Sequence, residues 1–265
     1  MEKNGFCKRV KSMICVDFRR MFTTPLFYIV VGSCFVIPIL ILVMTTMMDG
    51  TVTTNPQTGV ETTIEGFKNV WQIIGSVSGD SESAAMAMDM TSMCNVNLLY
   101  FFAAVFVCIF VSDDFRSGYA KNLFTVRAKK TDYVISKTLV GFVCGACMLM
   151  AFFVGAMLGG GVSQLPFDLG QVSEIEIVFC MLSKVCLMAV FVPIFLAVSV
   201  AAKQKLWLSI LGSLGASMLL FTMIPMLTPL NAGVINVVLC LAGGAMFSVG
   251  LGAVSNLILN KTSLV

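Results

Sequence analysis

Long runs of apolar residues, separated by shorter polar stretches, dominate the chain. A helix that crosses a lipid bilayer needs roughly 20 mainly apolar residues, and we count six such runs, over residues 27–48, 96–112, 138–162, 175–202, 206–227 and 234–259. The runs are continuous, whereas the strands of a membrane β-barrel alternate apolar and polar residues. The pattern therefore predicts an all-α integral membrane protein with six transmembrane helices, in one transmembrane domain over residues 1–265.

The composition supports this interpretation. Of the 265 residues, 58% are hydrophobic and 12% are charged, whereas a typical soluble domain is about 45–50% apolar and about 25% charged. The chain contains no histidine, which excludes His-based hydrolases and His-ligated zinc sites. A net charge of +3 argues against nucleic acid as a partner. We expect no catalytic residue and no metal site in this chain.

Two groups of sulfur-containing side chains are weak candidates for metal binding. Cys144 and Cys147 have metal-ligand spacing but lie inside an apolar run without a second pair, so they are interpreted as packing residues. A methionine-rich stretch over residues 86–93 could bind copper, because thioethers suit soft metals. No histidine or cysteine pair lies near that stretch, which favours an adaptable apolar contact surface.

The basic residues orient the bundle. Fifteen of the 17 Lys and Arg residues lie in residues 1–25, 113–137, 203–205 and the C-terminal tail, and the connections on the other side are mostly acidic. By the positive-inside rule, the basic side is the cytoplasm. Both termini are therefore expected to be cytoplasmic.

Two segments outside the spans have a recognisable pattern. Residues 6–22 predict a basic amphipathic elbow helix that lies along the inner membrane surface, with Asp17 interrupting its apolar arc. Residues 49–95 form the long outer loop between the first two spans. Its apolar residues between Ile64 and Val77, including Trp71, recur at helical spacing and predict a helix at the outer membrane interface.

The cytoplasmic loop over residues 113–137 is the candidate functional segment. Ser112 can cap a helix that carries Asp113 and Asp114 in its first turn, and Gly118 provides a flexible point. A solvated basic loop, required only by topology, would explain the charges. It would not explain the apolar face of this short helix, which lipid or a partner must cover: Phe115, Tyr119, Leu123 and Phe124.

The order of residues in this loop resembles the ABC type-2 permease family. The matching positions are Asp113 and Asp114, Arg116, Gly118, Lys121-Asn122-Leu123, Arg127, Tyr133 and Lys137. The layout of nearly the whole chain is also similar to that family, with an elbow helix, six spans and a coupling helix after the second span. The resemblance implies that this loop couples the chain to a cytoplasmic nucleotide-binding ATPase subunit, through Asp113, Asp114, Phe115, Arg116, Gly118, Lys121 and Arg127.

The resemblance also implies a function and partners. The most similar members are small permeases of the bacterial plasma membrane that export lantibiotics, related peptides or sodium. The sequence has no phosphate-binding G-x-x-x-x-G-K-[ST] motif, so ATP and Mg²⁺ are expected on the partner subunit. Two nucleotide-binding subunits imply two membrane halves, hence a second copy of the permease or a sister permease. We expect the exporter to move an amphipathic peptide or a similar hydrophobic substrate.

Other classes of function remain open at this point. A sodium or drug exporter and a non-transporting membrane assembly protein would show the same layout. A secondary transporter usually carries carboxylates within its spans, and we find none deep in any run. Lys184 is the one charged candidate, and it either snorkels to the outer interface or, together with Trp71, lies on the substrate path.

Overall fold

The computed structural model describes residues 2–54, 61–63, 66–75, 95–126, 129–169, 172–221 and 223–261. Within these ranges the secondary-structure elements are all helices apart from one short hairpin, which confirms an all-α integral membrane protein. The α-helices are α1 (Glu2–Thr23), α2 (Pro25–Met48), α4 (Leu99–Arg116), α5 (Tyr119–Val126), α6 (Lys130–Val162), α7 (Glu174–Ala202), α8 (Leu206–Phe221), α9 (Met223–Leu227) and α10 (Val234–Lys261). The other elements are strands β1 (Val52–Thr54) and β2 (Glu61–Thr63) and 3₁₀-helices η1 (Val70–Ile73) and η3 (Val96–Leu98).

Five helical segments in the described residues are long and apolar enough to cross a membrane: α2, η3 with α4, α6, α7 and α10. The expected single span over 206–227 is divided instead. Helix α8 has 16 residues, about 24 Å at 1.5 Å per residue, and α9 follows as a separate helix of five residues. Pro225 lies in the first turn of α9, where proline is tolerated because the amide hydrogens of a first turn have no acceptor within the helix.

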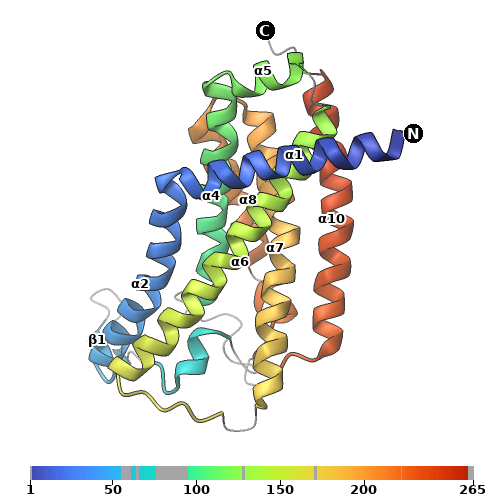
Figure 1. Cartoon of the computed structure of the whole chain (residues 1–265). Coiled ribbons are helices and arrows are strands. Elements are labelled where there is room, and N and C mark those ends of the chain that lie inside the picture. The colour runs from blue at the N-terminus through green and yellow to red at the C-terminus, as the bar shows by residue number, and fades with distance from the viewer. Residues whose placement is uncertain are drawn as a thin grey trace.

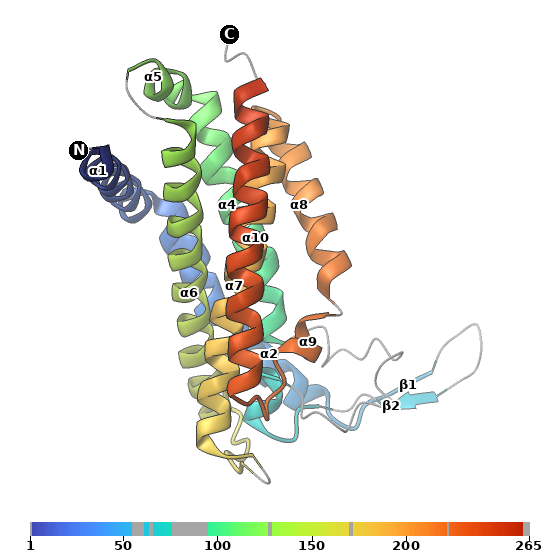
Figure 2. The ribbon, with the colours of Figure 1, turned by 90° about the vertical axis from the view of Figure 1, so that its right-hand side faces the viewer.

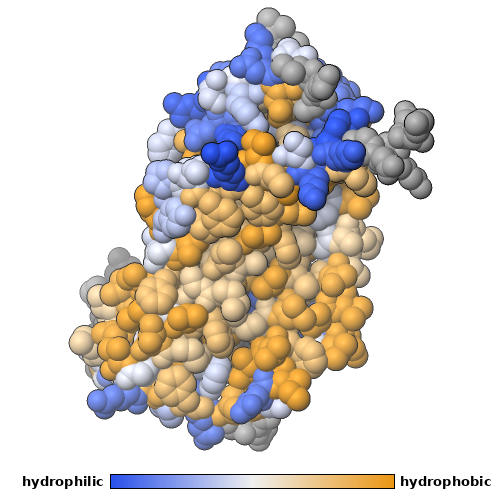
Figure 3. Space-filling model, viewed as in Figure 1, coloured by the Kyte–Doolittle hydropathy of each residue, from blue (hydrophilic) through white to orange (hydrophobic). Residues whose placement is uncertain are grey.

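The long helices run side by side, and the polar elements lie at the two ends of the bundle. Helix α1 crosses the bundle near the end that also carries α5 and the last turn of α10 (Figure 1). The β1–β2 hairpin lies at the opposite end (Figure 2). Figure 3 shows apolar side chains over most of this face and hydrophilic ones at its ends, mainly around α1 and α5. This distribution suits a protein whose middle faces lipid.

Glycines of α6 bring two long helices into backbone contact. A Cβ atom on Gly155 would lie 2.2 Å from the carbonyl oxygen of Phe35, and one on Gly159 would lie 2.9 Å from the Cα atom of Ile39. Both contacts are closer than any side chain allows. Small residues permit such close packing of helices within lipid, and they fix α6 against α2.

The described part of the outer loop differs from the expectation of an interfacial helix. Residues 66–75 contain only the short η1 turn, in which the Asn69 side chain accepts a hydrogen bond from the Trp71 amide at 3.1 Å. Gly75 follows this turn and disfavours its continuation into a longer helix. Ile73 and Ile74 are fully buried, so the turn packs into the end of the bundle. Residues 64–65 and 76–94, with the methionine-rich stretch, lie outside the described residues.

Candidate functional site

The predicted coupling segment begins at the end of a helix. Helix α4 continues to Arg116, so Ser112, Asp113 and Asp114 lie in its last turns. The expectation that Ser112 caps a new helix is therefore wrong. Gly118 ends this helical region with a φ of +72°, a left-handed conformation that glycine adopts without steric cost, and α5 begins at the next residue.

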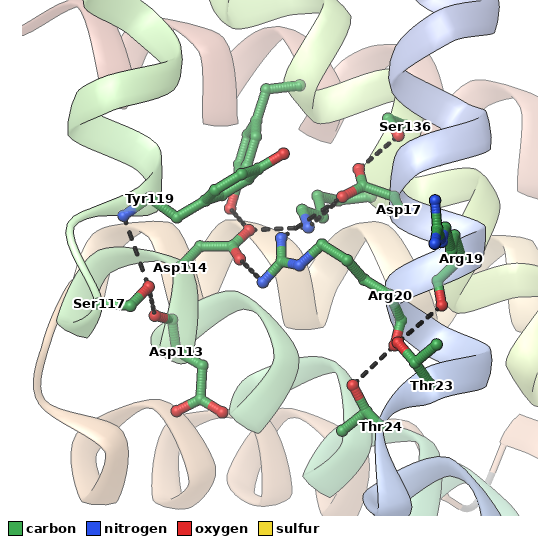
Figure 4. Close-up of polar contacts among 12 residues, drawn as sticks. Asp17, Arg19, Arg20, Thr23, Thr24, Asp113, Asp114, Ser117, Tyr119 and Ser136 are labelled. Atoms are coloured by element: carbon green, nitrogen blue, oxygen red, sulfur yellow. Dashed lines mark hydrogen bonds and ion pairs between the residues drawn. The ribbon is translucent and has the colours of Figure 1, made fainter.

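The two consecutive aspartates of α4 point in different directions. Asp113 is exposed, whereas Asp114 is fully buried, as is most of the Phe115 ring. Figure 4 shows the Asp113 carboxylate directed away from the contacts that Asp114 makes. Only one of the two acidic groups therefore serves a contact within the chain, and the other remains available at the surface.

Asp114 belongs to a cluster of four charged side chains, of which Arg20 is half-buried and the other three are buried. Lys137 Nζ of α6 lies 2.7 Å from Asp114 Oδ2 and 2.9 Å from Asp17 Oδ1 of α1. Arg20 of α1 lies 2.7 Å from Asp114 Oδ1 and 3.6 Å from Asp17 Oδ1. We call Asp17, Arg20, Asp114 and Lys137 the charge cluster; two acids and two bases make it electrically balanced.

Neutral side chains complete the charge cluster. The Tyr133 hydroxyl donates to Asp114 Oδ2 at 3.0 Å, and the Ser136 hydroxyl donates to Asp17 Oδ2 at 2.6 Å. The Lys137 ammonium also lies 4.1 Å from the centre of the Phe110 ring, within the range of a cation–π contact. A buried ion pair is tolerated when such additional contacts offset the loss of water.

Arg20 extends the cluster toward α5. Its guanidinium carbon lies 4.2 Å from the centre of the Tyr119 ring, the first residue of α5. Burial by itself lowers the pKa of Arg20, but the carboxylates of Asp114 and Asp17 outweigh it and raise the pKa above its ordinary value. Arg20 is therefore held as a cation between α1, α4 and α5 (Figure 4).

The sequence did not predict that helix α1 contributes side chains to the charge cluster. Its buried face carries Met13, Asp17 and Met21, four residues apart, so Asp17 occupies a position that the pattern assigns to an apolar side chain. A second ion pair joins α1 to the start of α6, where Arg9 Nε lies 3.1 Å from Asp132 Oδ2. The one sequence signal for this arrangement was the acidic residue within the apolar arc of the elbow helix.

The apolar face of α5 is covered mainly by the chain itself. The Phe124 ring lies 5.4 Å from the Tyr133 ring of α6, and Leu123 and Phe124 are half-buried against the core. This corrects the expectation that lipid or a partner must cover this face. The exposed face of α5 consists of polar residues instead: Lys121, Asn122 and Thr125. Arg127 lies outside the described residues.

A surface hollow lies beside the charge cluster. It has a volume of 490 Å³ and is lined by Arg20, Asp113, Arg116 and Ser117. Arg116 and Asp113 are both exposed, so the hollow presents groups of both signs next to the Gly118 turn. A partner with charges of both signs could bind here.

Lys184 and Trp71, the candidates for the substrate path, lie at the opposite end of the bundle. Lys184 is 1% exposed, and the expectation that it snorkels to the interface is wrong. Its Nζ atom contacts Thr228 and Asn97 within the protein. Trp71 is half-buried, and its indole N–H donates to the Phe167 carbonyl at 3.2 Å. Both side chains are engaged in contacts within the chain.

Among the described residues, no three His, Cys, Asp or Glu side chains form a group that could hold a metal ion. The nine cysteines in the described ranges carry free thiols, including Cys144 and Cys147. The expectation of no metal site stays a prediction, and the methionine-rich stretch lies outside these ranges.

The fold and the site define a multi-pass helical membrane protein in which a transverse helix, a short exposed helix and two long helices meet at one charged end. The family model for the ABC-2 family transporter protein matches residues 19–214. The chain therefore belongs to this family and is a membrane permease of an ABC transporter, a class that associates with ABC ATPase subunits. No curated protein and no solved structure matches the chain. The match spans the whole charge cluster except Asp17.

Proposed function

We propose that this chain is the membrane-spanning subunit of an ATP-driven exporter in the bacterial plasma membrane. In this proposal α8 and α9 together complete a sixth span, both termini are cytoplasmic, and α1 lies along the inner membrane surface. The distribution of basic residues supports this orientation, because α1, α5 and the α7–α8 turn carry most of them at one end of the bundle.

ATP hydrolysis belongs to a separate subunit in this proposal. The chain has no phosphate-binding loop motif, so ATP and Mg²⁺ bind the partner and the chain is not itself an enzyme. Two such ATPase subunits require two membrane halves. A second copy of this chain, or a sister permease, supplies the other half.

The charge cluster is the observation that carries the proposal. It joins α1, α4 and α6 through contacts of 2.7 to 2.9 Å, directly at the base of α5. A force applied to α5 and the adjacent hollow by an ATPase subunit therefore acts on three helices together. Asp113, Arg116 and Lys121 provide the exposed docking groups, and Asp114 provides the internal link.

For the substrate, we propose an amphipathic cationic peptide or a similar compound that partitions into lipid. The described residues place no carboxylate in the middle of a long helix; the buried acids Asp17, Asp114 and Asp132 all lie at the charged end in ion pairs. A small inorganic cation would need oxygen ligands or charge along its route. Exposed Glu174 at the other end of the bundle favours release of a cationic substrate.

Deleting the gene tests the substrate class. We expect deletion to sensitise cells to a panel of cationic antimicrobial peptides and to leave sodium tolerance unchanged, with recovery when the gene is restored. Sodium sensitivity without a peptide phenotype would contradict the peptide proposal and favour an ion exporter.

Surface substitutions test docking. Asp113→Lys reverses an exposed charge of the hollow without touching the charge cluster, so we expect normal insertion but less ATPase subunit co-purified with the membrane protein. Lys261→Glu, at the end of α10, is the matched charge reversal away from the hollow and should leave co-purification unchanged. Equal recovery of ATPase with both variants would contradict docking at this surface.

A further inference from the structure

The ammonium group of Lys184 is buried, and no carboxylate among the described residues pairs with it. The Lys184 Nζ atom contacts three neutral oxygens instead: Thr228 Oγ1 at 2.9 Å, Thr228 O at 3.3 Å and Asn97 Oδ1 at 3.5 Å. An ammonium group has three N–H donors, so each donor has one acceptor. Asn97 precedes α4 and Thr228 follows α9, so one side chain of α7 holds two other segments.

The segment that Lys184 holds fills the end of the bundle. Thr228, Leu230 and Ala232 are 1%, 5% and 0% exposed, and Pro229 is also buried. We call residues 228–232 the plug turn. Although it connects two helices, its side chains point into the protein, unlike those of most surface connections. Figure 2 shows α9 and the start of α10 at the end opposite α5.

The plug turn is held on two sides. Thr228 is fixed to α9, because its hydroxyl donates to the Ile224 carbonyl at 2.8 Å, and Lys184 holds the same hydroxyl and the Thr228 carbonyl. On the other side, the outer loop covers the turn: a Cβ atom on Gly75 would lie 3.5 Å from the Leu230 amide nitrogen. The plug turn therefore lies between Lys184 of α7 and Gly75 of the outer loop.

A buried charge within a span is costly, and such residues usually serve a function. A methionine at position 184 would be similarly long and unbranched but could not donate hydrogen bonds to Thr228 and Asn97. We propose that Lys184 is a positioning residue that latches the plug turn and so closes the outer end of the permease. Opening the export route toward the outside then requires the Lys184–Thr228 hydrogen bonds to break. That opening faces the outside of the cell rests on the proposed exporter function. The contact between Lys184 and the plug turn does not depend on that function.

Cysteine accessibility in intact cells tests the latch without substrate or ATPase. Ala232→Cys is introduced after three native cysteines have been replaced by alanine: Cys94 of the outer loop, and Cys180 and Cys240, whose thiols lie against the carbonyls of Thr228 and Leu227. The same background without Ala232→Cys gives the rate at which the remaining native thiols react. The rate of reaction with a membrane-impermeant maleimide is then compared between Lys184 and Lys184→Met. We expect Lys184→Met to increase the rate about tenfold or more, because each hydrogen bond from a charged donor contributes about that factor to an equilibrium constant. Lys184→Arg, which keeps a charged donor, should increase it less.

Val172→Cys is the matched control. Val172 is 8% exposed and lies in the connection before α7, a different segment from the plug turn, so its labelling should not respond to Lys184→Met. Thr228→Val provides a second test if Lys184→Met does not insert, because it removes the hydroxyl acceptor and keeps the shape. It should increase labelling at position 232 in the same direction.

Three results would overturn the latch: unchanged labelling at position 232 in Lys184→Met, unchanged labelling there in Thr228→Val, or an equal increase at positions 172 and 232. The last result would indicate general loosening of the protein. None of these measurements depends on transport. Failure of the latch is therefore distinguishable from failure of the proposed exporter, which the deletion phenotype tests.

Discussion

Replacing Lys137 with methionine removes one of the two cations from the charge cluster. The remaining side chains would carry a net negative charge at a site where Lys137 and both carboxylates are at most 2% exposed. Removing one partner of a buried ion pair typically costs about 3–5 kcal/mol, because the other partner is left uncompensated. We therefore expect Lys137→Met to lower the unfolding temperature on the order of 10 °C.

The buried thiols of the protein provide the assay. A dye that fluoresces on reaction with thiols reports unfolding in detergent, since Cys34, Cys144 and Cys180 are buried in the folded protein. Burial raises the barrier to reaction until the helices separate. Lys121→Met, on the exposed face of α5, is the matched control and should unfold at nearly the wild-type temperature.

A double-mutant cycle measures the interaction between Lys137 and Asp114. Adding Asp114→Asn to Lys137→Met leaves Asp17 and Arg20 as a balanced pair, so the double variant should be more stable than the sum of the single effects predicts, by about 1–3 kcal/mol. The electrostatic account of the cluster would be refuted by strict additivity. It would also be refuted if Lys137→Met unfolded at the same temperature as Lys121→Met.

Three further predictions concern backbone geometry and topology. Gly118→Ala should destabilise the turn before α5 by about 1–2 kcal/mol in the same unfolding assay, because its φ is +72°; Gly32→Ala, also in open space but in a regular helix, should not. Gly155→Ala should cost about 1–3 kcal/mol, since its Cβ atom would overlap a backbone carbonyl of α2, and an unchanged unfolding temperature would contradict that contact. In intact cells, an impermeant reagent should label a cysteine at Gly59 and should not reach one at Lys129 until the membrane is opened; labelling at position 129 would contradict the proposed orientation.

The long helices were predictable because a membrane-spanning helix depends on the sequence of its own segment. A backbone in hydrocarbon must satisfy its own hydrogen bonds, so an apolar run of sufficient length becomes a helix whatever its neighbours are. Helix α2 covers Pro25–Met48 where 27–48 was expected, and α10 covers Val234–Lys261 where 234–259 was expected. Helix α6 begins at Lys130, eight residues before the expected start, because its charged first turns are stabilised by α1 and α4.

The charge cluster was not predictable from the sequence, because its partners are far apart along the chain. Asp17 and Lys137 are 120 residues apart, and hydropathy contains no information on which charged residues meet. The same limit applies to Lys184. Its acceptors are two neutral residues from other segments, so the sequence offered only solvent or substrate as its surroundings. Asp113 and Asp114 are equivalent in the sequence. One is exposed and the other buried because of the way α4 is turned about its axis against α1 and α6.

Helix α6 joins the two ends at which these side chains act. It has 33 residues and spans about 50 Å, with Lys137 in the charge cluster near its start and Gly159 against α2 near its end. No proline interrupts α6, whereas α2 and α7 contain one each, so no missing amide breaks the hydrogen bonds along α6. A Cβ atom on its Gly160 would lie 2.2 Å from the Val70 side chain of η1, in the same segment that covers the plug turn. A displacement of the charge cluster along the axis of α6 would therefore reach the cover of the plug turn through one continuous helix.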